Sequence, residues 1–214
     1  MTPTKPEHFI GKTGTIAKVL FHKLERIKSE KLSALDRRYL FTGDAGTGKT
    51  SLAMAFASAI TGNSVDSILN KTSTNVDWIN GQSATVEVWR KWGEQCHYIP
   101  MYGNRIVQIV DEVDSISLAA ANESLSYLDA LPFHIVFIAT TNKSVEAIPD
   151  RMQSRFKIQR FTTVPEFQLA SWLGGKFNIN EATASDIAEK SRGNVRAAMT
   201  DALSIVETME ALAV

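Results

Sequence analysis

Residues 43–50 constrain the fold more than any other part of the chain. They read Gly-Asp-Ala-Gly-Thr-Gly-Lys-Thr and fit the pattern G-x-x-x-x-G-K-[ST]. An apolar run at 38–42 precedes them, and an alanine-rich helix former at 51–60 follows them. A glycine-rich loop between a strand and a helix can turn successive backbone N–H groups toward one anion. These residues therefore predict a phosphate-binding loop within an α/β fold.

Strand and helix candidates alternate along the first three quarters of the chain. The two most apolar runs, 105–110 and 134–139, are rich in β-branched residues and lack clean alternation. Such runs are typical of strands buried on both faces of a parallel sheet. Helices between the strands then cover both faces. The remaining candidates are strands at 75–79 and 156–161 and helices at 86–95 and 119–131.

The pattern changes after Pro165, where no further strand is visible. Three helices are expected there, at 166–173, 181–190 and 194–213, with breaks at Gly174-Gly175 and Gly193. We therefore predict two domains: an α/β core at 1–163 and a small all-helical domain at 164–214.

Composition narrows the possible partners. The 214 residues hold 23 Lys and Arg and 23 Asp and Glu, a formal charge of zero. Binding to nucleic acid through bulk positive charge is excluded, so DNA would need a local patch or several copies of the chain. The single cysteine, Cys96, excludes an intrachain disulfide. No apolar run approaches the roughly 20 residues of a membrane span, and we expect a cytoplasmic protein, of a cell or of a phage-infected host.

The loop residues explain how a nucleotide would be held. The Lys49 ammonium can reach the β- and γ-phosphates, and the Thr50 hydroxyl can bind Mg²⁺. The helix that begins near Gly48 adds the positive end of its dipole. A glycine-rich turn without a ligand is the alternative, which the strand–loop–helix context disfavours. The predicted contacts are Gly43, Asp44, Ala45, Gly46, Thr47, Gly48, Lys49, Thr50 and Ser51.

Polar residues follow two of the apolar strands. Asp111 and Glu112 come directly after the run at 105–110, at the end of a parallel strand where ligands bind in open α/β sheets. Asp111 would hold Mg²⁺ together with Thr50, and Glu112 would activate the attacking water. Asn142 ends the next strand and could align that water. The alternatives are a solvated acidic turn and a helix-capping asparagine.

Together these features resemble the AAA+ ATPases, from residue 9 to about residue 212. The resemblance implies ATP as the nucleotide and a five-stranded parallel sheet of order 5-1-4-3-2, followed by a helical lid. It also implies that Phe9-Ile10-Gly11-Lys12 packs beside the adenine, which adds Ile10 and Gly11 to the nucleotide contacts. Asn142 corresponds to sensor 1. Arg196, in Gly193-Asn194-Val195-Arg196, corresponds to sensor 2, which reaches the γ-phosphate.

Within that family, the clamp-loader subunits, as in replication factor C and phage clamp loaders, are the most similar. Ser154-Arg155-Phe156 is similar to their Ser-Arg-Cys motif, whose arginine acts on the neighbouring subunit's ATP. Phe156 stands in place of the cysteine. Arg151 competes with Arg155 for this role, and a plain surface ion pair is the alternative for either. Residues 78–83 resemble the second strand of those subunits, where the following helix faces DNA, which makes Arg90 and Lys91 candidate phosphate contacts.

The resemblance implies an ATP-hydrolysing protein that assembles with other copies or homologous subunits, acts on DNA and loads a sliding clamp or a similar factor. Clamp-loader subunits normally continue into a helical collar, and we expect this chain to lack it. A nucleotide-switched adaptor that recruits a helicase or recombination protein is an alternative. A remodeller of a protein client is another, disfavoured because residues 81–85 carry no aromatic side chain.

Several conspicuous side chains are expected to serve packing alone. Trp89 and Trp92 share one face of a helix and favour a core position over base stacking. The basic stretch 18–31 is expected to be the solvated side of an amphipathic helix. Its apolar face would be formed by Ile16, Val19, Leu20, Leu24 and Ile27.

Overall fold

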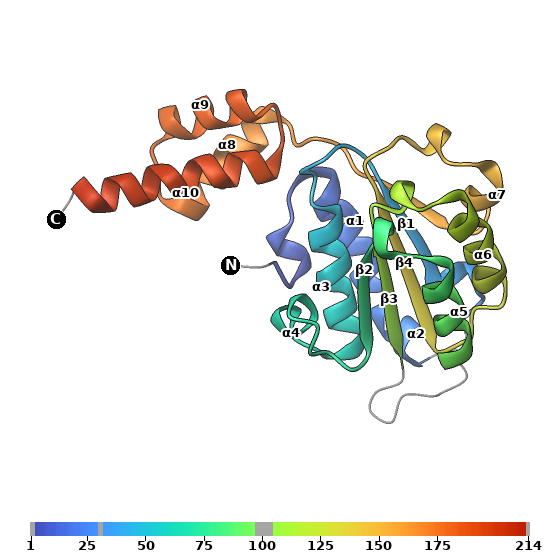
Figure 1. Ribbon diagram of the computed structural model, residues 1–214. Coiled ribbons are helices and arrows are strands. Elements are labelled where there is room, and N and C mark those ends of the chain that lie inside the picture. Colours follow the sequence, from blue (N-terminus) through green and yellow to red (C-terminus); the bar gives the residue numbers. More distant parts are fainter. Residues whose placement is uncertain (1–2, 30–31, 97–104, 213–214) are drawn as a thin grey trace.

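The computed structural model describes residues 3–29, 32–96 and 105–212. A five-stranded parallel sheet forms the centre, with the strand order β2-β3-β4-β1-β5 (Figure 1). This confirms the predicted order 5-1-4-3-2. The strands are β1 (Arg38–Thr42), β2 (Val76–Asn80), β3 (Ile106–Asp111), β4 (Ile135–Thr141) and β5 (Lys157–Arg160).

Helices cover both faces of the sheet, as predicted (Figure 1). One apolar cluster joins the sheet to α1 (Gly11–His22), α2 (Leu24–Ser29), α3 (Lys49–Thr61) and α4 (Val65–Leu69). A second cluster lies on the other face, against α5 (Val86–Gln95), α6 (Leu118–Asp129) and α7 (Asp150–Gln153). It contains Trp89 and Trp92, which are 1% and 5% exposed, so their predicted packing role is confirmed. Short 3₁₀ turns are η1 (Pro6–His8), η2 (Leu35–Arg37), η3 (Gly81–Ser83), η4 (Val113–Ser115) and η5 (Val145–Ala147).

The register brings the carboxyl ends of the strands together. Asn80 pairs with Asp111, and Val110 pairs with Ala139 on the next strand. On the other side of β4, Thr141 pairs with Thr42, which directly precedes the phosphate-binding loop. Polar residues that are far apart in the sequence therefore meet at one edge of the sheet.

Three helices follow the sheet: α8 (Glu166–Phe177), α9 (Glu181–Ser191) and α10 (Val195–Leu212). Figure 1 shows them as a separate group, joined to the core by one extended segment; we call this group the lid. Its apolar cluster, which includes Val164, Leu169, Leu173 and Ile187, contains no side chain from the sheet. The division after residue 163 stays a prediction.

Two local expectations were wrong. The glycines at 174 and 175 do not end α8, which runs on to Phe177 and stops at Asn178, in the left-handed conformation (φ 53°). The basic stretch forms two helices, α1 and α2, and Val19 is 47% exposed. Residues 30 and 31 of that stretch lie outside the described residues, and so does residue 213 of the last predicted helix. Within the described ranges, no helix combines the length and apolar character needed to cross a bilayer.

Candidate functional site

The phosphate-binding loop is shaped by three glycines with positive φ. Gly48 (φ 91°) is the N-cap of α3, so the free N–H groups of that helix face the loop. A Cβ on Gly46 would lie 1.9 Å from Oδ1 of Asn194, so the loop closely approaches the start of α10. A Cβ on Gly43 would lie 2.2 Å from the carbonyl oxygen of Phe161. A side chain at position 43 would therefore clash with the backbone, so packing requires Gly43 independently of its predicted role in phosphate binding.

Lys49 is the buried cation of the loop. Its side chain is in the first turn of α3, the residue is 5% exposed, and its ammonium donates to the carbonyls of Gly43 and Asp44, both at 2.7 Å. Desolvation lowers the pKa of Lys49, and the carboxylates of Asp111 and Asp44 partly oppose this. A partly desolvated ammonium beside free helix N–H groups is well suited to bind phosphate oxygens.

Asp111 lies opposite Thr50. The Thr50 hydroxyl donates to Oδ1 of Asp111 over 2.8 Å, and Thr140 on β4 donates to the same oxygen. One hydroxyl and one carboxylate, open to a polar cavity, suit Mg²⁺, which keeps several waters and takes few protein ligands beside phosphate oxygens. The donor set therefore fits the predicted metal site of Thr50 and Asp111.

Glu112 follows Asp111 but has a different backbone conformation, left-handed with φ 56° and ψ 51°. Its Oε2 accepts from the Asn80 amide at 3.2 Å, and its Oε1 accepts from the Asn142 amide at 3.4 Å. The two amides come from the carboxyl-terminal ends of β2 and β4. The candidate base, Glu112, is thus held between side chains at the ends of β2 and β4, the two strands that flank β3 in the sheet.

A polar cavity of about 180 Å³ unites these groups. Arg196, from the first turn of α10, lines it and lies close enough to Lys49 to lower that group's pKa. Of the four predicted catalytic residues, three, Glu112, Asn142 and Arg196, therefore share one cavity. The other predicted residues that line it are Ala45, Gly46, Gly48, Lys49, Thr50, Ser51 and Asp111.

A larger cavity of about 420 Å³ adjoins the polar one and shares Gly48 and Ser51 with it. Phe9 and Ile10 line it from the N-terminal segment, and Trp172 lines it from α8 of the lid. Thr47, which is buried, also borders it. Gly11 is not among its lining residues; a Cβ there would lie 3.3 Å from Val164. The N-terminal segment and the lid together thus enclose an apolar space beside the loop.

Two predicted loop contacts lie to one side of the polar cavity. Gly43 and Asp44 border a different hollow, on the side of Arg160 and Glu146. Asn142 borders that hollow as well as the polar cavity. Asp44 enters the site through its carbonyl, which accepts from Lys49.

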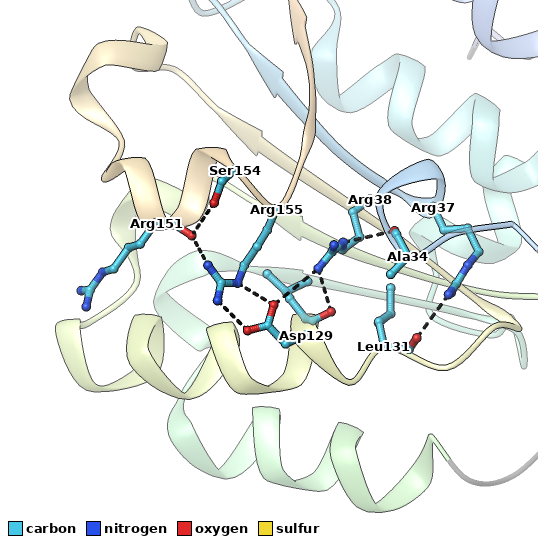
Figure 2. A network of polar contacts seen from close by, with 9 residues as sticks. Ala34, Arg37, Arg38, Asp129, Leu131, Arg151, Ser154 and Arg155 are labelled. Carbon is cyan, nitrogen blue, oxygen red and sulfur yellow. Dashed lines mark hydrogen bonds and ion pairs between the residues drawn. The ribbon is translucent and has the colours of Figure 1, made fainter.

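Arg155 lies away from both cavities, in a polar network at the end of α6 (Figure 2). Its Nε and Nη2 donate to the two carboxylate oxygens of Asp129 at 2.8 and 2.5 Å, and its Nη1 donates to the carbonyl of Arg151. Arg38, the first residue of β1, lies 4.0 Å from the same carboxylate. Figure 2 shows the Arg151 side chain directed away from this network, and no described residue is its partner. Within one chain, Arg155 therefore forms an ion pair, which was the alternative to a role at the ATP of a neighbouring subunit.

Three residues that position the site were missed in the sequence. Two of them are Asn80, whose amide donates to Glu112, and Thr140, whose hydroxyl donates to Asp111. Thr13 of α1 is 3% exposed and donates to the carbonyl of Thr47 at 2.8 Å, which ties the N-terminal helix to the loop. Of the two candidate DNA contacts, Arg90 lies 3.5 Å from Glu123, and Lys91 is exposed.

Comparison with known proteins identifies the family. A family model described as DNA polymerase III, delta subunit matches residues 17–165. DNA polymerase III subunit gamma of Buchnera aphidicola (subspecies Acyrthosiphon pisum) is 28% identical in an alignment of 194 residues, which covers 82% of this chain and 52% of that protein. DNA polymerase III subunit tau of Bacillus subtilis is 29% identical, over 79% of this chain and 32% of its own length. The chain thus spans about half of the length of the first relative and about a third of the length of the second.

A solved structure with a similar fold agrees with this family. The Thermotoga maritima RuvB Holliday junction branch migration motor superposes with a TM-score of 0.75 at 20% identity, over 99% of this chain and 67% of that one. This likeness shows the AAA+ fold. Because the family model covers most of the sequence, this AAA+ chain belongs to the DNA polymerase III delta subunit family.

Proposed function

We propose that the chain binds ATP with Mg²⁺ between its core and lid, hydrolyses it, and works as one subunit of a clamp-loader assembly on DNA. The observation that carries this proposal is the polar cavity in which Lys49, Glu112, Asn142 and Arg196 meet. These four side chains come from four separate parts of the chain. A cation, a carboxylate, an amide and a second cation around one small polar space are the groups that phosphoryl transfer to water requires.

The residues divide the chemistry among them. The loop amides and Lys49 bind the phosphates, and Thr50 and Asp111 hold Mg²⁺, which when bound neutralises charge on the β- and γ-phosphates. Glu112 accepts a proton from the attacking water, and Asn142 orients that water. Arg196 brings a positive charge from the lid to the terminal phosphate.

The role in DNA replication rests on the relatives. Proteins named as DNA polymerase III gamma and tau subunits match most of this chain, and so does the delta subunit family model. We infer that other copies or homologous subunits, DNA and a sliding clamp are its partners. Arg155 or Arg151 would act on the ATP of the next subunit.

Nucleotide binding and hydrolysis are tested by two substitutions. Lys49→Ala should weaken Mg·ATP binding in calorimetry by about 10- to 150-fold, the loss expected for a hydrogen bond between charged groups. Glu112→Gln should still bind ATP but hydrolyse it roughly 10² to 10⁴ times more slowly, because a general base is lost. Lys18→Ala is the matched control, since Lys18 is exposed on α1 and lines neither cavity. Unchanged ATP affinity in Lys49→Ala would refute the proposal.

The role on DNA has its own test. Primed DNA should raise the ATPase rate, and the stimulation should fall steeply with salt as phosphate contacts are screened. An ATPase rate that does not respond to primed DNA at any salt concentration would favour the nucleotide-switched adaptor instead.

A further inference from the structure

The side chain of Thr140 forms hydrogen bonds to both acidic residues of the candidate site, Asp111 and Glu112. It is 1% exposed and lies on β4, next to the end of β3. Its hydroxyl accepts a hydrogen bond from the backbone N–H of Glu112 at 3.1 Å and donates one to Oδ1 of Asp111. A hydroxyl has one proton to donate, so its donation to Asp111 and its acceptance from Glu112 fix its orientation.

The contact to Glu112 matters because that residue has a left-handed backbone, which residues other than glycine rarely adopt. At this turn the Glu112 carboxylate lies between Asn80 and Asn142 and accepts a hydrogen bond from each amide. An N–H group at such a turn has no strand partner in register, and the Thr140 hydroxyl supplies one.

The contact to Asp111 makes Thr140 one of two hydroxyl groups that donate to this carboxylate. Oδ1 of Asp111 accepts from Thr50 at 2.8 Å as well as from Thr140. The carboxylate is thus held from α3 on one side and from β4 on the other. One buried hydroxyl therefore links the candidate metal ligand to the backbone of the candidate base.

We propose that Thr140 is a positioning residue that fixes Asp111 and Glu112 relative to each other, so that the metal ligand and the base that activates water keep a constant geometry. The proposal rests on the proposed ATPase function. Thr140 does not line the polar cavity, so it acts through its two neighbours rather than on the nucleotide.

The neighbouring Thr141 offers a matched control. It is fully buried on the same strand, and its hydroxyl also makes two hydrogen bonds, donating to Asp114 at 2.7 Å and accepting from the Lys143 N–H at 3.0 Å. Neither partner is Asp111 or Glu112. Thr141→Val therefore removes a comparable buried hydroxyl without touching the proposed linkage.

The experiment compares Thr140→Val, Thr140→Ser and Thr141→Val with the wild type. The measurements are ATP affinity without Mg²⁺, kcat at saturating ATP, and the Mg²⁺ concentration that gives half-maximal rate. Thr140→Val should lower kcat by at least about 10-fold and raise the Mg²⁺ requirement, because small displacements of reacting groups are costly. Its Mg²⁺-free ATP affinity should stay at the wild-type value, and Thr140→Ser should restore both altered quantities.

Equal kcat values in Thr140→Val and Thr141→Val would overturn the proposal, and so would a serine variant that restores nothing. If Thr140→Val does not fold, hydrogen exchange in the wild-type protein decides. The Glu112 amide should be protected, since its acceptor is a buried hydroxyl, and rapid exchange there would contradict the linkage. A wild type that binds no ATP would instead refute the proposed function, and the exchange measurement would still test Thr140.

Discussion

Asn80 shows how one side chain can restrain the reactive group of the site. Its amide donates to Oε2 of Glu112, the carboxylate that would have to accept a proton from water. We expect Asn80→Ala to raise the ATPase rate without DNA by about 10-fold, the size of one hydrogen bond to a charged group. The measurement is a steady-state rate at saturating Mg·ATP. Asn70→Ala, at the end of α4, is the control, and a lower rate in Asn80→Ala would show that Asn80 supports Glu112 instead.

Single residues also show what the sequence could reveal about the site. The loop, Asp111, Glu112 and Asn142 were predicted because they follow strands whose apolar character is plain in the sequence. Asn80 and Thr140 were missed because their roles depend on the register of neighbouring strands and on the left-handed turn at Glu112. Nothing in a local pattern distinguishes Thr140, which positions the site, from Thr141, which binds Asp114.

At the scale of elements, the pair of Arg155 and Asp129 ties the segment after α7 to the end of α6. The hydrogen bonds from Arg155 hold the pKa of Asp129 below its ordinary value of 3.8. A lowered folded-state pKa means that the pair stabilises the fold above that ordinary value, and that this stabilisation is lost as the pH falls through the folded pKa. Because Asp129 is largely exposed, we expect Asp129→Asn to cost no more than about 1 kcal/mol at pH 7.

The same variant tests the sign of that effect. The Tm of Asp129→Asn should lie below that of the wild type at pH 7. The gap should close as the pH falls from 3.8 through the lower pKa of the folded state, below which the wild-type carboxylate is also protonated. Asp186→Asn is a useful control, since Asp186 pairs with Lys190 four residues along the exposed face of α9. A gap that widens in acid would contradict the assignment.

Helix α8 explains why one element boundary could not be predicted. Two adjacent glycines lower helix stability by about 1 kcal/mol each relative to alanine, so a break there was a reasonable expectation. Leu169 and Leu173 are fully buried in the lid cluster, and Trp172 packs edge-on against Phe177 one turn beyond the glycines. This packing carries the helix to Asn178, which ends it in the left-handed conformation.

Trp172 brings α8 to the larger cavity, where the proposed function places the base of ATP. Its half-buried ring lines the larger cavity, and the Lys176 ammonium lies 5.2 Å from the ring centroid. We expect Trp172→Ala to weaken ATP binding by about 5- to 150-fold, as when an aromatic that stacks on a base is removed, and to leave inorganic triphosphate binding unchanged. Phe167→Ala, on the same helix but 73% exposed, is the control. Equal losses for both ligands would place Trp172 outside base recognition.

At the scale of the whole molecule, the proposed function requires one more group than the cavity contains, an arginine from the next subunit. The polar cavity is lined by the groups proposed to bind phosphate and activate water, while Arg155, at the end of α6, and Arg151 lie outside it. A chain that lacks Glu112 and a chain that lacks the trans-acting arginine should therefore complement each other. We expect mixtures of Glu112→Gln with Arg155→Ala to hydrolyse ATP faster than either variant alone, because some interfaces then pair an intact base with an intact arginine.

The structure adds a second arm to that experiment. Within one chain Asp129 holds Arg155 through two hydrogen bonds, whereas the Arg151 guanidinium has no partner among the described residues. For Arg155 to reach a neighbour, the neighbour's phosphate must compete with the Asp129 carboxylate. Mixtures of Glu112→Gln with Arg151→Ala should then show no rescue, because Arg151→Ala alone retains activity. If instead Arg151→Ala is inactive and is the variant rescued, Arg155 serves to fix α7, and the trans-acting arginine is Arg151.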